Sequence, residues 1–196
     1  MSEVELKLNM DERDVQKLIN ILAREHKELH LYSVYYDTSD RVLSEHGYAL
    51  RLRQSGQQLI QTLKGGGSVE NGLHRRDEWE WEVGRHGIDY PLLEDKLGEL
   101  YPKIHKQLEP LFETEFIRTQ WDIENAFGAV ELAFDHGEVR GQCGAERLCE
   151  LELELKDGDE KALHELFAFL DKQLSLSPNN VSKAERGYLL SEFGFE

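Results

Sequence analysis

The sequence predicts an α+β fold: an eight-stranded antiparallel β-barrel with a charged lumen and helices packed outside it. The first observation is the opening stretch 1–8, where Glu3, Glu5 and Lys7 alternate with apolar residues. The second is the stretch 149–156, where glutamates alternate with leucines in the same way. The third is a set of segments with apolar residues at helical spacing, which can cover the apolar outer face of such a barrel.

Composition and charge limit the class of protein. The chain has 196 residues, enough for a substantial core, and we expect one domain over residues 1–196. Its formal net charge of −16 argues against nonspecific binding to nucleic acid or to an anionic membrane. No apolar run is as long as a membrane span and no signal-peptide pattern opens the chain, so we expect a cytoplasmic protein. The two cysteines, Cys143 and Cys149, suggest neither a disulfide framework nor a zinc site.

Six more stretches alternate between apolar and polar residues or are rich in aromatic and β-branched residues, as strands are. These expected strands are 29–36, 48–53, 59–64, 73–83, 116–123 and 129–135. Turns or hairpin loops are expected between them at 37–40, 54–57 and 125–128. The glycine run 65–68 is expected to start a flexible loop, and His136 and Gly137 to form a tight turn.

Helices are expected in five parts of the chain. Asp11 is a plausible N-cap for a helix over about 11–25, and a short helix over 42–45 should end at Gly47. Between His86 and residue 111 we expect two short helices, broken at Pro91, Pro102 and Pro110. Asp159 should cap a helix whose apolar residues are Leu163, Leu166, Phe167 and Leu170. Ser182 and Glu185 fit a capping box that opens the last helix, which sets Lys183 and Arg186 on one face.

The polar faces of the strands have two interpretations. For any single strand, one face in the core and a charged face in water is the simpler interpretation. Taken together, however, the polar faces are dominated by acidic and basic residues: Glu3, Glu5, Lys7, Arg51, Arg53, Lys64, Arg76, Glu78, Glu80, Arg118, Glu131, Glu150, Glu152 and Glu154. In a closed barrel they would line a charged lumen, which favours the second interpretation.

The charged side chains indicate a particular chemistry. Clustered carboxylates without His or Cys favour hard cations such as Mg²⁺ or Mn²⁺. Arginine and lysine side chains favour phosphate oxygens, which arginine can bind in a bidentate manner. Enzymes of phosphoryl transfer combine a metal ion held by carboxylates with basic residues that bind the phosphate groups. A linear triphosphate would fit a tunnel lined in this way.

Several motifs carry a family resemblance. The stretch 3–7 resembles the Glu-x-Glu-x-Lys signature of the CYTH, or triphosphate tunnel metalloenzyme, superfamily. The resemblance continues in the family's order through 36–38, 50–53, 62–64, 76–80, 150–154 and 182–188. It implies an eight-stranded antiparallel tunnel, in agreement with the strands expected above. The stretch 71–76 looks most like bacterial inorganic triphosphatases with a CYTH domain. Those often carry a C-terminal helical CHAD domain, for which this chain has no room, so a stand-alone enzyme and a fragment both stay open.

The resemblance also implies roles for individual residues. The expected metal ligands, for Mg²⁺ or Mn²⁺, are Glu3, Glu5, Glu150, Glu152 and Glu154. The expected contacts to the triphosphate are Lys7, Arg51, Arg53, Lys64, Arg76, Arg118, Lys183 and Arg186. Glu5, Glu152, Glu154 and Lys64 are expected to take part in catalysis. In many members the strand of Arg118 carries a second basic residue nearby, whereas here Gln120 lies on the same face as Arg118.

Two sets of residues have open or structural roles. Glu78 and Glu80 could orient basic residues, position water or bind a second metal, or they could simply form ion pairs across the lumen. Tyr36 is expected in the core. Packing or surface positions are expected for the two cysteines and the three tryptophans.

The expected activity is metal-dependent hydrolysis of inorganic tripolyphosphate to diphosphate and phosphate. Thiamine triphosphatase and class IV adenylyl cyclase are the enzymatic alternatives, although nothing in the sequence identifies an adenine pocket. A non-catalytic polyphosphate or nucleotide sensor would use the same basic residues, and a plain α+β scaffold would bind no polyanion at all. The expected partner is a small-molecule triphosphate, and we expect binding neither to nucleic acid nor to a membrane. The preferred substrate, the number of metals and the oligomeric state stay open.

Overall fold

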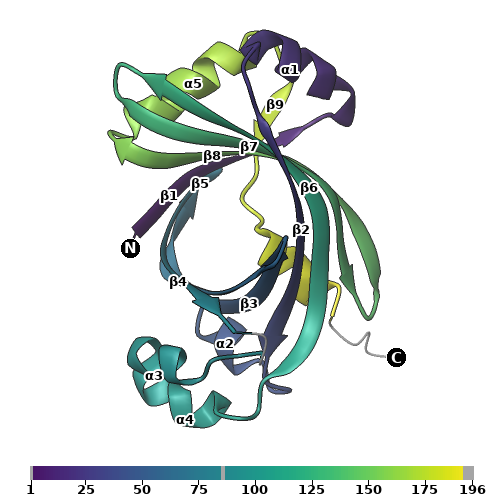
Figure 1. Cartoon of the computed structure of the whole chain (residues 1–196), viewed down its shortest axis with the longest axis vertical. Helices are drawn as coiled ribbons and strands as arrows, with labels where there is room; N and C mark the ends of the chain where they lie inside the picture. The colour runs from purple at the N-terminus through teal and green to yellow at the C-terminus, as the bar shows by residue number, and fades with distance from the viewer. Residues whose placement is uncertain (1, 85–86, 192–196) are drawn as a thin grey trace.

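The centre of the molecule is a closed antiparallel barrel (Figure 1). The computed structural model describes residues 2–84 and 87–191, so Met1 and His86, which bounded two expected segments, lie outside it. Within the described residues the strands run in the order β5-β4-β3-β2-β6-β7-β8-β1, and a β1–β5 pairing closes the ring of eight. The bounds are β1 Ser2–Met10, β2 Lys27–Asp37, β3 Tyr48–Ser55, β4 Gln58–Glu70, β5 Leu73–Val83, β6 Glu109–Asn125, β7 Gly128–Gly141 and β8 Gly144–Gly158. A short ninth strand, β9 (Leu176–Pro178), pairs with β1. The predicted eight-stranded barrel is confirmed.

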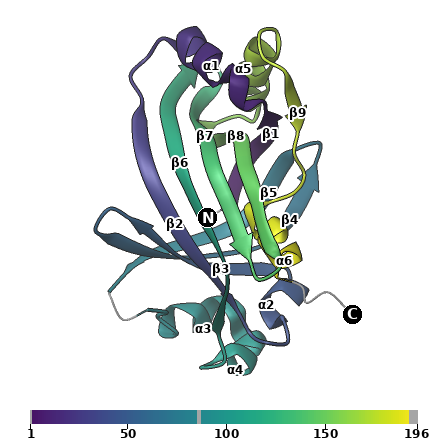
Figure 2. The ribbon, with the colours of Figure 1, turned by 90° about the vertical axis from the view of Figure 1, so that its right-hand side faces the viewer.

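Most of the helices lie outside the barrel, in two groups on opposite sides of it, as Figures 1 and 2 show. On one side lie the 3₁₀ turn η1 (Glu12–Asp14), α1 (Val15–Leu22) and α5 (Lys161–Asp171). On the other side lie α2 (Val42–Glu45), α3 (Pro91–Leu97), the 3₁₀ turn η2 (Gly98–Leu100) and α4 (Tyr101–Ile104). The last helix, α6 (Lys183–Leu189), packs against β6 and β7. None of the helices in the described part of the chain is both long and apolar enough to cross a bilayer.

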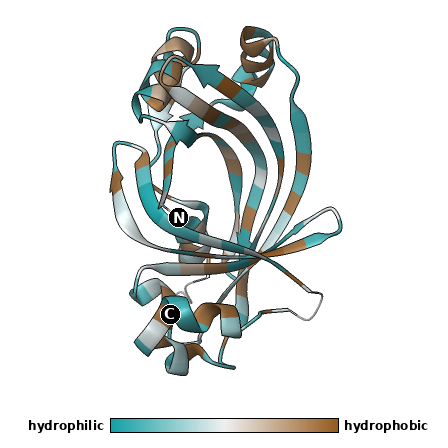
Figure 3. Ribbon diagram, turned by 60° about the vertical axis from the view of Figure 1, so that its left-hand side comes forward, coloured by the Kyte–Doolittle hydropathy of each residue, from teal (hydrophilic) through white to brown (hydrophobic). Residues whose placement is uncertain are grey.

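Hydrophilic and hydrophobic residues alternate along the strands (Figure 3). The polar residues line the interior and the apolar residues lie on the outer face. On β8, Leu151 and Leu153 face outward and are fully buried in a core that α1 and α5 complete. On the opposite side, Trp79 and Trp81 of β5 pack into a second core with residues of α2, α3 and α4. Tyr36 packs against this second core, as expected. The helices therefore cover the apolar outer face, and the charged residues are left to the interior.

Two glycine segments differ from the predicted turns. The run at 65–68 does not end β4 but forms a bulge within it, with the register against β5 shifting between Gly65 and Ser68. Gly67 has a φ of +100°, and a Cβ there would lie 1.8 Å from the carbonyl oxygen of Arg75. The predicted turn at Gly137 is also wrong, because β7 runs through it. A Cβ at Gly137 would lie 2.1 Å from the carbonyl oxygen of Glu115 on β6, so this glycine allows two strands to approach closely.

The predicted helix boundaries needed three corrections. The helix expected over 11–25 ends at Leu22, because Ala23 adopts a left-handed conformation with φ 44°. Pro91 is the first residue of α3 and Pro102 the second residue of α4, since proline is tolerated in the first turn of a helix. Pro110 belongs to β6, at the irregularity in its pairing with β2. Two predicted caps are confirmed: Asp11 accepts a hydrogen bond from the backbone N–H of Arg13 at 2.9 Å, and the capping box of α6 is complete.

Candidate active site

The inner faces of the strands surround a cavity of about 280 Å³. Among the described residues, eight basic and seven acidic side chains line it, so the cavity is nearly neutral inside a protein of net charge −16. The lining contains most of the predicted site residues: Glu3, Glu5, Lys7, Arg51, Arg53, Lys64, Arg76, Glu78, Glu80, Arg118, Glu152, Glu154 and Lys183. The predicted residues Glu150 and Arg186 are not in the lining and lie beneath it.

One wall of the cavity carries a row of carboxylates. Glu131 of β7 is directly opposite Glu154 of β8, and Glu154 is directly opposite Glu5 of β1. Like charges in directly opposed cross-strand positions destabilise a sheet. Burial, together with the charges of Glu3 and Glu131, raises the pKa of Glu154 even though Lys156 contacts it at 2.8 Å. Lys7 lies 3.3 Å from Glu5, and Arg118 and Lys156 lie 3.9 and 3.7 Å from Glu131. Because these contacts are long, the charges of Glu5 and Glu131 are only partly compensated.

The carboxylate row has the donor chemistry of a divalent-cation site, although its three members do not all bring oxygens within 4.8 Å of one another in the described structure. Each of its three members offers carboxylate oxygens, the donors that Mg²⁺ and Mn²⁺ prefer, and no His or Cys lines the cavity among the described residues. Glu3 lies in the same lining, although Lys64 holds it at 2.7 Å. Lys156, which covers Glu154 in this structure, is about half exposed and so can move away from it. The repulsion along the row is the kind of local strain that a bound cation relieves.

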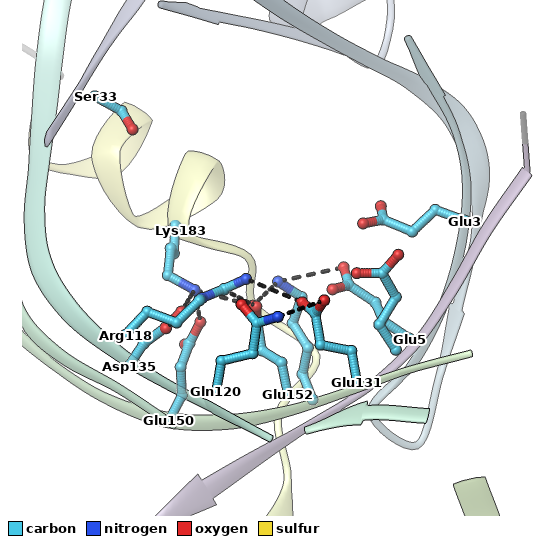
Figure 4. A network of polar contacts seen from close by, with 12 residues as sticks. Glu3, Glu5, Ser33, Arg118, Gln120, Glu131, Asp135, Glu150, Glu152 and Lys183 are labelled. Atoms are coloured by element: carbon cyan, nitrogen blue, oxygen red, sulfur yellow. Dashed lines mark hydrogen bonds and ion pairs between the residues drawn. The ribbon is translucent and has the colours of Figure 1, made fainter. Parts of the chain in front are cut away.

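A different cluster forms the floor of the site. Asp135, Glu150 and Glu152 bring one oxygen each within 4.8 Å of one another, a spacing that could hold a metal ion. The ammonium group of Lys183 lies among them instead, 2.7 Å from Asp135, 2.9 Å from Glu152 and in direct contact with Glu150 (Figure 4). Lys183 comes from α6, whose capping box fixes the first turn that carries it. An ammonium group of the protein itself therefore lies among the carboxylates of this trio.

The floor cluster shifts the pKa values of its carboxylates in opposite directions. Although burial opposes ionisation, Lys183, Lys7 and Arg118 lower the pKa of Glu152 well below its ordinary value. Arg118 donates two hydrogen bonds of 2.8 Å to Asp135 and one of 2.5 Å to Glu152. Burial raises the pKa of Glu150 more than the nearby lysines lower it. Arg118 and Lys7 thus reach the cavity but are already engaged by carboxylates.

The wall opposite the carboxylate row carries two arginines of β3, Arg51 and Arg53, whose guanidinium groups are not fully paired with carboxylates. Among the described residues, no carboxylate lies within ion-pair distance of Arg53, which donates a hydrogen bond to Ser33 Oγ at 3.1 Å. Burial and the charges of Arg51 and Arg118 lower the pKa of Arg53 to about 10. Arg51 reaches Glu78 and Glu80 only at 3.7 and 3.5 Å, and its buried Nε has no hydrogen-bond partner in the described structure. These guanidinium groups are equipped to bind an anion.

Glu78 and Glu80 lie beside this basic wall. Glu78 is 3.3 Å from Lys64, and Glu80 accepts a hydrogen bond from Thr62 at 2.9 Å. Although burial opposes it, the charge of Arg51 and the Thr62 hydrogen bond lower the pKa of Glu80. These contacts favour the interpretation in which the two glutamates orient basic residues.

Arg76 and Arg186 mark two different environments. Arg76 donates a hydrogen bond to Nδ1 of the buried His74 at 2.6 Å and faces the cavity. Arg186, on the same face of α6 as Lys183, is held by Glu146 at 3.2 Å and Glu150 at 3.5 Å, below the lining. Gln120, where a basic residue was expected, donates to Glu131 at 2.9 Å and so supports the carboxylate row.

Sequence reasoning left several residues out of the site. Glu131 was placed on the polar face of its strand, but only the cross-strand register shows what it opposes, and Asp135 of the same strand was not singled out. Tyr35 lines the cavity, and although burial opposes it, Arg51 and Arg53 lower the pKa of its hydroxyl. Its position in the alternation of β2, opposite in face to Tyr36, was the available signal.

Comparisons with known proteins place the chain in a family. Residues 1–188 match the CYTH domain. The chain is 34% identical over 208 aligned positions to the inorganic triphosphatase of Haemophilus influenzae, an alignment that covers all of this chain and 56% of that protein. The chain therefore spans about half the length of this curated relative.

Solved structures show the same fold at low sequence identity. HpAC1 from Hippeastrum, described as an adenylyl cyclase candidate with a dominant triphosphatase activity, superposes with a TM-score of 0.76 at 18% identity, covering 98% of each chain. An adenylate cyclase candidate from Bacillus halodurans superposes with a TM-score of 0.63 at 20% identity, covering 94% of this chain and 96% of that one. Residues 1–188 match the family, and the Haemophilus relative aligns with the whole of this chain. Together with the closed barrel and its charged interior, these findings show that this chain belongs to the CYTH domain family.

Proposed function

We propose that the chain hydrolyses inorganic tripolyphosphate to diphosphate and phosphate with the help of a divalent cation, Mg²⁺ or Mn²⁺. One observation carries the proposal: cations without full pairing and carboxylates without full pairing face each other across the same cavity. Arg51 and Arg53 stand on one wall, and Glu131, Glu154 and Glu5 stand on the other. A polyanion bridged to a divalent cation complements both walls at once.

The basic wall would bind and orient the phosphate chain. Arg53 offers a guanidinium that no described carboxylate occupies, and Arg51 offers a buried N–H without a partner. Lys64 and Arg76 extend the same wall along the cavity. Arginine donors arranged in this way would hold several phosphate oxygens and keep the terminal phosphorus toward the carboxylate row.

The acidic wall would hold the metal through Glu5, Glu154 and Glu131, with Glu3 close by. When bound there, a divalent cation neutralises phosphate charge and activates water as a nucleophile. The carboxylates' part is to fix the cation opposite the basic wall. Lys183, Arg118 and Lys7 keep the floor carboxylates neutralised and immobile, which holds the adjacent β8 side chains in place.

Support from relatives agrees with this assignment. The Haemophilus relative is named an inorganic triphosphatase, and it aligns with the whole of this chain. Adenylyl cyclase is the second candidate, because structural neighbours of the same fold carry that description. A sensor that binds polyphosphate without hydrolysing it would use the same walls.

The test compares substrates and metals in one assay. Phosphate release would be measured from tripolyphosphate, thiamine triphosphate and ATP, each with Mg²⁺, with Mn²⁺ and with a chelator, while cyclic AMP is measured from ATP. We expect metal-dependent release that is fastest from tripolyphosphate. Cyclic AMP as the main product would favour the cyclase, and tight tripolyphosphate binding without release would favour the sensor.

A further inference from the structure

Arg76 occupies an unusual position on the basic wall. Its side chain lines both the main cavity and a second cavity of about 260 Å³ beside it. Among the described residues no carboxylate lies within ion-pair distance of its guanidinium. The hydrogen bond that holds it runs from Nη2 to Nδ1 of His74, at 2.6 Å. An arginine held by a neutral group keeps its full charge available to an anion.

The hydrogen bonds of His74 define its protonation state. Nε2 lies 2.9 Å from the backbone carbonyl oxygen of Asn179, which can only accept, so Nε2 carries the proton and donates. The Arg76 guanidinium can only donate, so Nδ1 is the acceptor. His74 has no exposed surface, and no water competes for either nitrogen. The ring is therefore neutral, in one tautomer, and both of its nitrogens are used.

We propose that His74 is a positioning residue for phosphate binding, because it fixes the Arg76 guanidinium in the orientation that faces the cavity. The inference rests on the proposed function. An arginine side chain has four rotatable bonds, and ordering it only when the ligand arrives would reduce affinity. His74 and Arg76 are two residues apart on β5 and share its inner face, so the strand itself sets their separation.

A purely structural role would use the other nitrogen of the ring. The bond from Nε2 to Asn179 ties β5 to the segment that precedes α6, and the N–H of Asn179 also donates to the carbonyl of Lys7 at 2.9 Å. Loss of this tie would disturb α6 whether or not Arg76 moved. Because the two hydrogen bonds use different ring nitrogens, they can be removed separately.

Two amide substitutions separate these roles. His74→Asn places an amide oxygen near the position of Nδ1, so it keeps an acceptor for Arg76 and loses the bond to Asn179. His74→Gln places an amide N–H near the position of Nε2, so it keeps the bond to Asn179 and loses the acceptor. The dissociation constant of tripolyphosphate would be measured by calorimetry on the full chain, with a chelator present to prevent hydrolysis. We expect His74→Gln to bind about tenfold more weakly, as for loss of a hydrogen bond to a charged group, and His74→Asn to stay within about twofold of wild type.

Control variants complete the experiment. In an Arg76→Gln background the difference between the two His74 variants should vanish. Arg75→Gln removes the same charge from the adjacent position of β5, where Arg75 faces outward and pairs with Glu160, and it should leave affinity unchanged. Should His74→Gln not fold, the comparison of His74→Asn with Arg76→Gln remains decisive, since only the second should lose affinity.

The outcomes are distinguishable. Equal affinities of His74→Gln and wild type, weak binding by His74→Asn, or a penalty that persists without Arg76 would each overturn the positioning role. If the wild-type chain does not bind tripolyphosphate in the chelator but releases phosphate from it with Mg²⁺ or Mn²⁺, the positioning role alone is overturned. If it neither binds tripolyphosphate nor releases phosphate with either metal, the proposed function is overturned, and this inference with it.

Discussion

At the scale of single residues, Glu154 illustrates how an unfavourable contact can serve binding. It stands between Glu131 and Glu5 in directly opposed positions, and its side chain is only 26% exposed. Without a cation the three charges repel one another, and burial together with the charges of Glu3 and Glu131 raises the pKa of Glu154. A site of this kind costs stability when empty and recovers it when a metal binds.

This reasoning gives a prediction for Glu154→Gln. Removing one carboxylate from the row should weaken Mn²⁺ binding by at least about tenfold, the lower end of the effect of outer-shell partners on metal affinity. Mn²⁺ titration followed by electron paramagnetic resonance, without substrate, measures this directly. Asp157→Asn is the matched control, because Asp157 is an exposed carboxylate on the same strand. Equal Mn²⁺ affinity of Glu154→Gln and wild type would exclude the row as the metal site.

Lys183 presents the opposite case, a charge cluster that the protein neutralises for itself. Lys183→Met would leave Asp135, Glu150 and Glu152 buried without their central cation. Breaking a buried ion pair costs about 3–5 kcal/mol, so the variant should be strongly destabilised in a chelator. Because the emptied trio then has metal-ligand spacing, Mg²⁺ or Mn²⁺ should raise the melting temperature of the variant more than that of wild type. A smaller metal-induced rise in the variant would contradict this account of the trio.

At the scale of elements, the contact between β5 and α5 holds a helix to the outside of the barrel. Arg75 donates two hydrogen bonds, of 2.8 and 2.6 Å, to the Glu160 carboxylate beside the first turn of α5. These hydrogen bonds lower the pKa of Glu160. Both side chains are more than a third exposed, so solvent screens the pair and its contribution is modest.

The pH dependence of this contact has a definite sign. A carboxyl group whose pKa is lowered on folding contributes stability above its unfolded pKa, about 4.3 for glutamate, and loses that stability as the pH falls through its folded value. Glu160→Gln should therefore lower the free energy of unfolding by up to about 1 kcal/mol at pH 7. Urea unfolding at pH 7 and at decreasing pH should show the two proteins converging in acid. A difference that grows as the pH falls would show that Glu160 acts otherwise.

Strand faces could be predicted from the sequence, but strand ends could not. Alternation assigned Arg51 and Arg53 correctly to the lumen. A shift of one residue in the pairing would turn every apolar side chain of the strand to the wrong face, so the apolar pattern determines which face is which. The extent of β4 was missed because a glycine in a bulge and a glycine in a loop look alike in the sequence. At Gly67 the decisive fact is the approach of Arg75 from the next strand, which is a tertiary contact.

At the scale of the whole molecule, closure of the barrel turns strand faces into two opposed walls. The composition of the lumen could be predicted, because charged residues recur on the polar faces of strands far apart in the chain. The pairing within the lumen could not. That Lys183 would reach Asp135, and that Arg186 would fall below the lining, depends on how α6 sits against β6 and β7.

The two walls also explain how a strongly acidic protein can bind a polyanion. The net charge of −16 lies mostly outside a cavity whose lining is close to neutral. Within that lining the incompletely paired cations and carboxylates are on opposite sides, so a triphosphate bridged to a metal satisfies both. Neither a free polyanion nor a free metal would satisfy both walls alone.

The most direct test of this account is the ³¹P NMR spectrum of tripolyphosphate incubated with the purified chain and Mg²⁺. We expect orthophosphate and diphosphate to appear in equal amounts, and no change when a chelator replaces the metal. Tripolyphosphate that stays intact with both Mg²⁺ and Mn²⁺ would contradict the central claim that the two walls form a hydrolytic site.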